Sequence, residues 1–144
     1  MKTIQQILND KGPDIWSVTP ETPLGDALQL MSDRNIGAIL VLDGQELVGI
    51  FSERDFARKM KGVSELDKNL PVSEVMTRRV VYVKPEQTVS DGMNLMAEKK
   101  IRHLPVLDKE KTVVGLVSVM DIVRTIISDQ QFTIDQLEQY VYHD

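Results

Sequence analysis

The chain has 144 residues, a formal net charge of −5, a hydrophobic fraction of 42% and no cysteine. A chain of this length forms one compact domain or two small, mutually dependent halves. The acidic balance argues against a nucleic-acid partner, and the lack of cysteine excludes disulfides and thiolate sites. No apolar run reaches the ~18 residues of a membrane span and no signal peptide begins the chain, so we expect a cytoplasmic protein with no membrane partner.

The first predicted elements are a short helix and a turn in residues 1–14. Ile4, Ile7 and Leu8 have helical spacing, and Gly12 followed by Pro13 gives a stop signal. A first folded unit then spans residues 15–60. It is expected to contain a strand at 15–18, a helix with Thr22 as N-cap, strands at 38–42 and 47–51, and a helix from residue 52 to about 60.

A polar linker and a short helical segment occupy residues 61–76, and a second unit follows at 77–128. In the second unit Thr88 is the expected N-cap of the first helix, with Asp91 three residues later. Strands are expected at 104–107 and 112–117, and a helix at 118–128. The tail, residues 129–144, is predicted to form a C-terminal helix that packs on the body or on a second subunit.

The two units repeat the same sequence at an offset of 65 residues, which becomes 66 after one insertion in a polar turn. Identical pairs include Val18/Val83, Asp26/Asp91, Met31/Met96, Val41/Val106, Gly49/Gly115, Ser52/Ser118, Asp55/Asp121 and Arg58/Arg124. Such a repeat predicts one β-α-β-β-α unit used twice, with pseudo-twofold symmetry and two equivalent clefts. The fold class expected is α/β (α+β), with the two halves sharing a core.

A glycine–serine–aspartate motif closes each repeat: Gly49, Ser52 and Asp55 in the first, and Gly115, Ser118 and Asp121 in the second. Serine followed three residues later by aspartate is typical of a helix cap. Glycine in a strand beside a helix N-terminus indicates close backbone approach and a site that favours anions. Serine can then bind a phosphate and aspartate the hydroxyls of a ribose, and these roles are compatible with capping.

Cationic residues gather in the second copy, where Arg102 and His103 precede Leu104 and Pro105. Proline inside a strand indicates an edge or a cleft wall. These residues form either a solvated loop or a phosphate-facing pair. Arg54 and Lys84 are further candidate cations.

These features together resemble a tandem pair of CBS domains, named for cystathionine β-synthase. The resemblance rests on the paired motifs, on Thr-Pro-Glu-Thr and Lys-Pro-Glu-Gln before the first helices, and on the segment from His103 to Asp108; it covers roughly residues 1–128. It implies two units packed through their sheets, with clefts that bind adenine nucleotides: AMP most often, also ADP, ATP, NAD or S-adenosylmethionine. It also implies a homodimer in the form of a flat disc of four units.

The resemblance assigns roles to individual residues. Asp55 and Asp121 would hold ribose hydroxyls, Ser52 and Ser118 would contact phosphate, and Val18, Ala38, Val83 and Leu104 would line the adenine pockets. Arg102, His103 and Pro105 have no counterparts in the first copy, which carries Gly37, Ala38 and Leu40. One tight site and one weak or empty site are therefore expected.

The function expected is that of a non-catalytic module that senses cellular energy state and signals to an unidentified partner protein by ligand-linked conformational change. AMP or another adenine nucleotide is the regulatory ligand, with no required cofactor. No catalytic residues and no metal site are expected, because His103 and His143 lack a second ligand at helical spacing. The alternative is a dimerising interaction scaffold with empty clefts that docks onto an enzyme.

Overall fold

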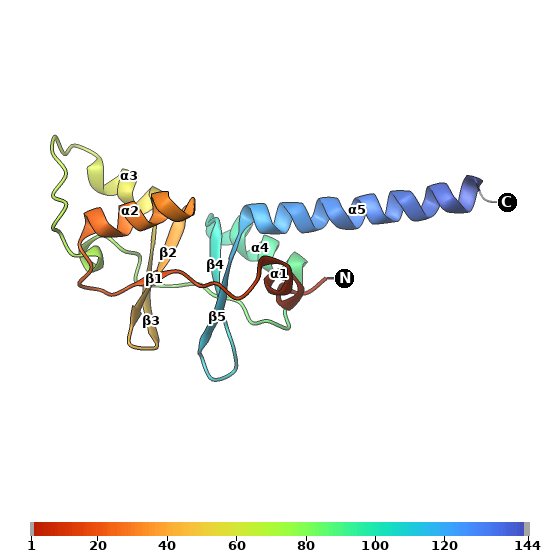
Figure 1. The fold of residues 1–144 in the computed structure, drawn as a ribbon, viewed down its shortest axis with the longest axis horizontal. Helices are drawn as coiled ribbons and strands as arrows, with labels where there is room; N and C mark the ends of the chain where they lie inside the picture. The colour runs from red at the N-terminus through yellow and green to blue at the C-terminus, as the bar shows by residue number, and fades with distance from the viewer. Residues whose placement is uncertain (1, 143–144) are drawn as a thin grey trace.

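The two copies of the repeat build two small β-sheets in the computed structural model, which describes residues 2–142. The strands are β1 (Ser17–Val18), β2 (Ala38–Asp43) and β3 (Glu46–Ser52) in the first sheet, and β4 (His103–Leu107) and β5 (Val113–Ser118) in the second. β2–β3 and β4–β5 are antiparallel hairpins, and each has a register shift at the same point of the repeat. The hairpins lie side by side with their turns toward the same end of the molecule (Figure 1).

The parallel strand that opens the first sheet has a reduced counterpart in the second. Val18 of β1 pairs with Val41 in parallel, and Val83 makes the equivalent isolated bridge to Val106. Val83 and Val106 lie 65 positions after Val18 and Val41, the same offset that relates the two sequence repeats. The pseudo-twofold symmetry predicted from the repeat is therefore present in the strand pairing, and the mixed α+β fold class is confirmed.

Helices flank both hairpins, and a single 3₁₀ turn lies in the linker. The α-helices are α1 (Ile4–Lys11), α2 (Leu24–Arg34), α3 (Glu53–Met60), α4 (Val89–Lys99) and α5 (Val119–Tyr142), and the 3₁₀ turn is η1 (Val72–Glu74). Thr88 caps α4 in a capping box with Asp91, as predicted. The predicted cap of α2 is wrong: Pro23 is the N-cap residue, and the Thr22 hydroxyl accepts instead from the Thr19 N–H.

The free N–H groups at the start of α2 are satisfied by the linker instead of a side chain. Leu24 N–H donates to the Leu70 carbonyl at 2.7 Å, and Val72 N–H donates back to Thr22 at 2.9 Å. The start of α4 has the same reciprocal pair, in which Val89 N–H donates to Lys2 and Ile4 N–H to Gln87. The segment that precedes each unit therefore packs against the other unit.

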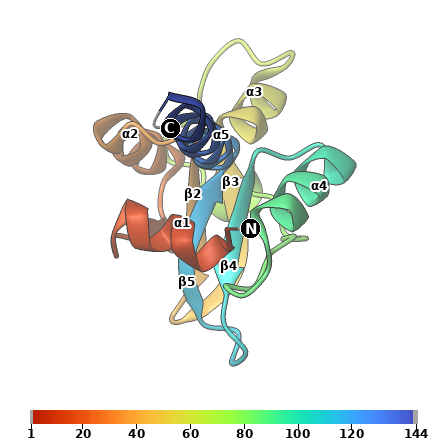
Figure 2. The ribbon, with the colours of Figure 1, turned by 90° about the vertical axis from the view of Figure 1, so that its right-hand side faces the viewer.

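This exchange of segments also completes the hydrophobic interior. α1 inserts Ile4, Ile7 and Leu8 into the cluster formed by the second repeat. Residues 66–76 do the same for the first repeat, with Val72 fully buried. The expectation of one shared core is wrong, because the buried residues form two clusters. Figure 2 shows α1 beside β4 and β5.

The C-terminal region differs from the two helices expected, because α5 continues without a break through residue 128 to Tyr142. Nothing between residues 119 and 142 provides a Gly or Pro to end the helix. Among residues 2–142, no helix combines the length and apolar character that crossing a membrane requires.

Candidate functional site

A cleft of about 780 Å³ lies where the two units meet. Its first wall comes from the end of β3 and from α3, including Ser52, Asp55 and Arg58. Its second wall comes from residues 99–105, which run from the end of α4 into β4, and residues 77–81 complete the cleft. Because both repeats contribute walls, a molecule bound here contacts both units at once.

Asp55 is the buried carboxylate of this cleft, with 8% of its surface exposed. Ser52 caps α3 by accepting the Asp55 N–H at 3.2 Å, while Asp55 Oδ2 accepts the Ser52 N–H at 2.9 Å and the Ser52 hydroxyl at 3.0 Å. Asp55 Oδ1 accepts the Thr77 hydroxyl at 2.8 Å. The capping box therefore fixes the carboxylate in one orientation, with Oδ1 accepting a single protein donor.

Cationic side chains dominate the rest of the lining. Six of them line the cleft against the carboxylates of Glu53 and Asp55: Arg54, Arg58, Arg79, Lys99, Lys100 and Arg102. The Arg54 guanidinium also donates to the Lys100 carbonyl and so joins α3 to the end of α4. In a chain of net charge −5, this concentration makes the cleft locally positive and favourable to anions.

His103 stands at the pseudo-symmetric position of Ala38 and lines the same cleft. A Cβ added to Gly37 would lie 3.4 Å from His103 Nε2 and 3.1 Å from Glu53 Oε1, so these two side chains meet over the glycine. Burial lowers the pKa of His103, and the positive charges of Lys11 and Arg102 act in the same direction, against the raising effect of Glu53 and Asp121.

Asp121, the counterpart of Asp55, is held by an ammonium group from α1. Lys11 Nζ lies 2.8 Å from Asp121 Oδ2 and donates to the Leu116 carbonyl at 2.7 Å. In the first unit, Thr77 supplies both equivalent bonds: its N–H donates to Ile50 and its hydroxyl to Asp55. One charged side chain therefore replaces a neutral residue at the second aspartate.

The ion pair also governs the charge state of Asp121. Burial raises the pKa of this carboxyl, but the hydrogen bonds from Lys11 and the Ser118 N–H, together with the charge of Lys11, outweigh it. The pKa of Asp121 therefore lies below its usual value. Asp121 is ionised and directly neutralised by a cation, whereas Asp55 is bound by uncharged donors.

The motif glycines are explained by packing within the chain. A Cβ on Gly49 would lie 2.5 Å from Met76 Sδ and 3.0 Å from the Thr77 carbonyl oxygen. A Cβ on Gly115 would lie 2.5 Å from Leu8 Cδ2. Close approach at these glycines was predicted correctly, but the approaching groups belong to the exchanged segments. The glycines therefore carry no evidence for a ligand.

The cleft gathers part of the predicted residue set. Ser52, Arg54, Asp55, Arg102, His103 and Pro105 line it. Val83 and Leu104 are fully buried in the second hydrophobic cluster, Ala38 is buried, and Val18 packs against the first cluster. Lys84 is exposed in the turn before α4, and Ser118 and Asp121 form the second cap beside Lys11.

Several residues of the cleft and of the second aspartate were missed by the sequence analysis: Lys11, Glu53, Arg58, Thr77, Arg79, Lys99 and Lys100. The sequence could have indicated a role for Arg58, because both copies of the repeat have arginine here, at Arg58 and Arg124, and a hydrophobic core does not require arginine. Arg79 stands 68 residues after Lys11, the same offset that relates the exchanged segments, such as Ile4 and Val72.

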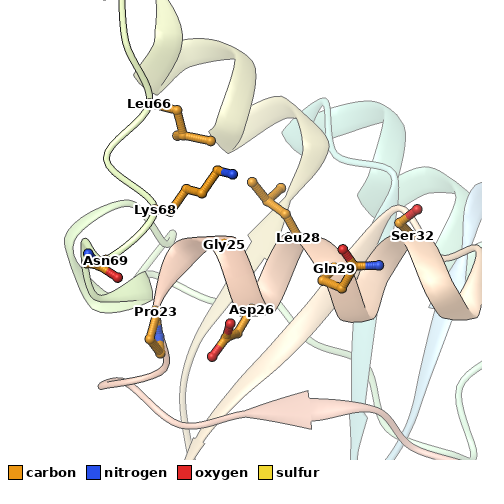
Figure 3. Close-up of a pocket in the computed structure, with 9 residues that line it drawn as sticks. All are labelled: Pro23, Gly25, Asp26, Leu28, Gln29, Ser32, Leu66, Lys68 and Asn69. Carbon is orange, nitrogen blue, oxygen red and sulfur yellow. The ribbon is translucent and has the colours of Figure 1, made fainter.

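A second cavity, of about 620 Å³, lies between the start of α2 and residues 66–69 (Figure 3). Its polar side chains are those of Asp26, Gln29, Ser32, Lys68 and Asn69. The first N–H groups of α2 donate to the Leu70 and Lys68 carbonyls, so these N–H groups are not available to bind an anion. The cavity lacks the converging charges of the cleft at Asp55.

Metal binding has no visible basis in the part of the chain that the structure describes. No three His, Cys, Asp or Glu side chains within residues 2–142 come together in a way that could hold an ion. His143, considered above as a possible ligand, lies outside the described residues.

A family model described as CBS domain matches the chain twice, over residues 7–62 and 72–128. The chain belongs to the CBS-domain family. It is 33% identical to the mitochondrial CBS domain-containing protein CBSX3 of Arabidopsis thaliana, covering 96% of this chain and 71% of that protein. A CBS-domain protein structure from Burkholderia ambifaria is 45% identical, with a TM-score of 0.84 and coverage of 92% and 99%.

One solved CBS-domain relative contains a nucleotide. The structure of CBSX2 in complex with AMP has a TM-score of 0.74 and 25% identity, and the match covers 90% of this chain and 99% of CBSX2. The family and the pseudo-symmetric pair of units are thus established for the present chain.

Proposed function

We propose that this CBS pair is a regulatory module that binds an adenine nucleotide in the cleft at Asp55. The observation that carries the proposal is the combination of one buried, oriented carboxylate with six cationic side chains around a cleft of about 780 Å³. Pockets of ~300–1,000 Å³ accommodate small-molecule ligands and cofactors. AMP bound to the relative CBSX2 supports this ligand class.

Asp55 is suited to hold the ribose. An ionised carboxylate has about four acceptor positions, and three protein donors occupy positions on Asp55. The position left on Oδ1 can accept a ribose hydroxyl without breaking the helix cap. The dual role proposed for Ser52 and Asp55 is therefore consistent with the geometry.

The cations suit the phosphates. Arg54 and Arg58 come from α3, Arg79 from the connecting chain, and Lys100 and Arg102 from the second unit. AMP was the expected ligand, but the number of cations favours a nucleotide with more than one phosphate, because each added phosphate gains further charge-assisted contacts. ADP, ATP and NAD are therefore stronger candidates than AMP.

The two clefts should differ in affinity. A ligand at Asp121 must compete with the Lys11 ammonium at 2.8 Å, whereas a ligand at Asp55 displaces no ion pair recorded within residues 2–142. Arg124 is also close to Asp121, at 3.5 Å. We assign the tight site to Asp55 and the weak one to Asp121.

Regulation follows from the position of the cleft between the units. A nucleotide that contacts α3 and residues 99–105 together stabilises one relative arrangement of the units by its differential affinity for that arrangement. The change would be read by an unidentified partner protein. The module acts without catalysis, as part of a homodimer, in the cytoplasm.

The test is calorimetric titration with AMP, ADP, ATP, NAD and S-adenosylmethionine, alongside thermal unfolding. A nucleotide at about 100 times its dissociation constant stabilises the fold by roughly 2.7 kcal/mol, which raises the melting temperature by several degrees. Asp55→Asn should abolish the shift, while Asp43→Asn, which changes an exposed carboxylate at the end of β2, should retain it.

Two results would contradict the proposal. The first is that no nucleotide binds to the wild-type protein, which would favour the ligand-free scaffold. The second is that Asp55→Asn binds as tightly as the wild type. Arg79→Gln serves as a second variant that leaves the helix cap intact. It should weaken the binding of ATP more than the binding of AMP.

A further inference from the structure

The second half of α5 extends away from the rest of the molecule. Figure 1 shows the helix projecting well beyond the two sheets, with its C-terminal end at the extreme of the long axis. The last ion pair between α5 and the body joins Asp129 to Lys2 at 3.2 Å. Every residue from 130 to 141 is exposed.

This projecting segment is rich in apolar side chains. Ile134 is 48% exposed, Leu137 60% and Val141 64%, and Ile127 just before it is 59% exposed. Most helical stability in proteins comes from the packing of an amphipathic face. β-branched Ile and Val have a lower helix propensity than unbranched side chains. A partner surface that buried these side chains would therefore stabilise the projecting segment.

Several apolar positions follow a seven-residue repeat along the whole helix, while the exposed Phe132 and Tyr140 lie off it. Met120, Ile127, Ile134 and Val141 recur every seven residues and correspond to position a. Val123, Gln130 and Leu137 lie three residues after the first three and correspond to position d. We call this set of seven residues the α5 seam. Such a pattern is typical of a coiled coil, and one polar position in a seam commonly fixes its register.

We propose that the α5 seam binds the α5 seam of a second copy of this chain in an antiparallel, two-stranded coiled coil. In that arrangement position a of one helix faces position d of the other. Ile127 of each chain then contacts Leu137 of the other, and Val123 of each chain contacts Val141 of the other. A twofold axis relates the two copies of each contact. Gln130 lies next to this axis.

Charge complementarity selects the antiparallel orientation. Arg124 and Glu138 both occupy position e, which flanks the seam. In the antiparallel register Arg124 of each chain lies beside Glu138 of the other, which gives two ion pairs. In a parallel pair the same residues are 14 positions apart, about 21 Å along the helix, and cannot meet.

This dimer differs from the flat disc expected from the family resemblance. Antiparallel overlap places the two bodies at opposite ends of the helix pair, with their nucleotide clefts far from the contact. The proposal is therefore independent of nucleotide binding, and either can fail without the other.

The first experiment measures the oligomeric state of the full chain by sedimentation over a concentration series. The wild type should be dimeric, and Leu137→Asp should be monomeric at the same concentrations. Gln136→Asp is the matched control, because it adds the same charge one residue away, off the seam, and should remain dimeric. A monomeric wild type, or a dimeric Leu137→Asp, overturns the proposal; the latter result would indicate the disc.

The second experiment tests orientation by charge reversal. Arg124→Glu alone and Glu138→Arg alone place like charges opposite each other in an antiparallel homodimer, and each should weaken it by roughly ten-fold. Mixing the two variants restores both ion pairs, so the mixture should dimerise as tightly as the wild type. Equal dimerisation of each variant and of the mixture would refute the antiparallel register. Melting curves of each variant confirm that the body is folded.

Discussion

The ion pair between Lys11 and Asp121 offers a direct test of how α1 is attached to the second unit. Lys11→Met keeps much of the apolar stem and removes the ammonium that bonds Asp121 and the Leu116 carbonyl. Removing one partner of a buried pair costs about 3–5 kcal/mol, and an exposed pair contributes less than ~1 kcal/mol. The side chain of Lys11 is 38% exposed and that of Asp121 10%. We therefore expect a loss of about 1.5–2 kcal/mol after allowing for solvent screening.

The assay is urea or thermal unfolding at several pH values. A loss of this size lowers the melting temperature by about 6 °C for a chain of this length. The folded-state pKa of Asp121 is lowered, so the unfolded chain binds this proton more tightly. The stabilisation is fully present above the unfolded value, near 3.9, and is lost as the pH falls through the folded value. The difference between Lys11→Met and the wild type should therefore shrink below about pH 4.

Lys109→Met is the control, because it removes an exposed lysine from the turn between β4 and β5. The reasoning fails if Lys11→Met and Lys109→Met are equally stable at neutral pH. It also fails if the loss in Lys11→Met is the same at acidic and neutral pH.

Two further predictions concern the first unit and the cleft. Gly49→Ala should cost about 1–3 kcal/mol in urea unfolding, because its Cβ would overlap Met76 Sδ and crowd the Thr77 carbonyl. Combining it with Met76→Ala should give less than the sum of the two losses, and strict additivity would show that the clash is relieved elsewhere. Burial lowers the pKa of His103, so the unfolded chain takes up this proton first, and the stability of the ligand-free protein should fall as the pH drops through about 6.5. His103→Gln should flatten that part of the pH profile; an unchanged slope would assign it to other groups.

The internal repeat predicted most of the helices and strands, because these elements depend mainly on local sequence. Strand pairs, the Thr88 cap and the Ser52–Asp55 cap all depend on residues that are close in sequence or related by a fixed offset. The cap of α2 failed because its N–H groups bond the Leu70 carbonyl, a long-range contact that replaces the side chain expected from local rules. Continuity of α5 was missed because Asp129 was read as a boundary between two helices.

The candidate site was predicted in part for the same reason. Ser52, Asp55, Arg102 and His103 belong to motifs that stand out in the repeat, and they line one cleft. Lys11 contacts Asp121 across 110 positions of sequence, and nothing in its local sequence distinguishes it from other helix-terminal lysines. Lys99 and Lys100 similarly acquire their role from the meeting of the two units.

The exchange of segments between the units has a consequence for the order in which the protein is made. α1 leaves the ribosome before the elements that bury it, because the strands and helices around Ile4, Ile7 and Leu8 extend to Ile122. At typical rates of synthesis, about 5–20 residues per second, these apolar residues wait on the order of ten seconds for their partners. The first unit can form its interior as soon as Val72 and Met76 have emerged. The growing chain thus carries one folded unit and one exposed apolar helix, so α1 is expected to depend on chaperones for longer than the first unit does.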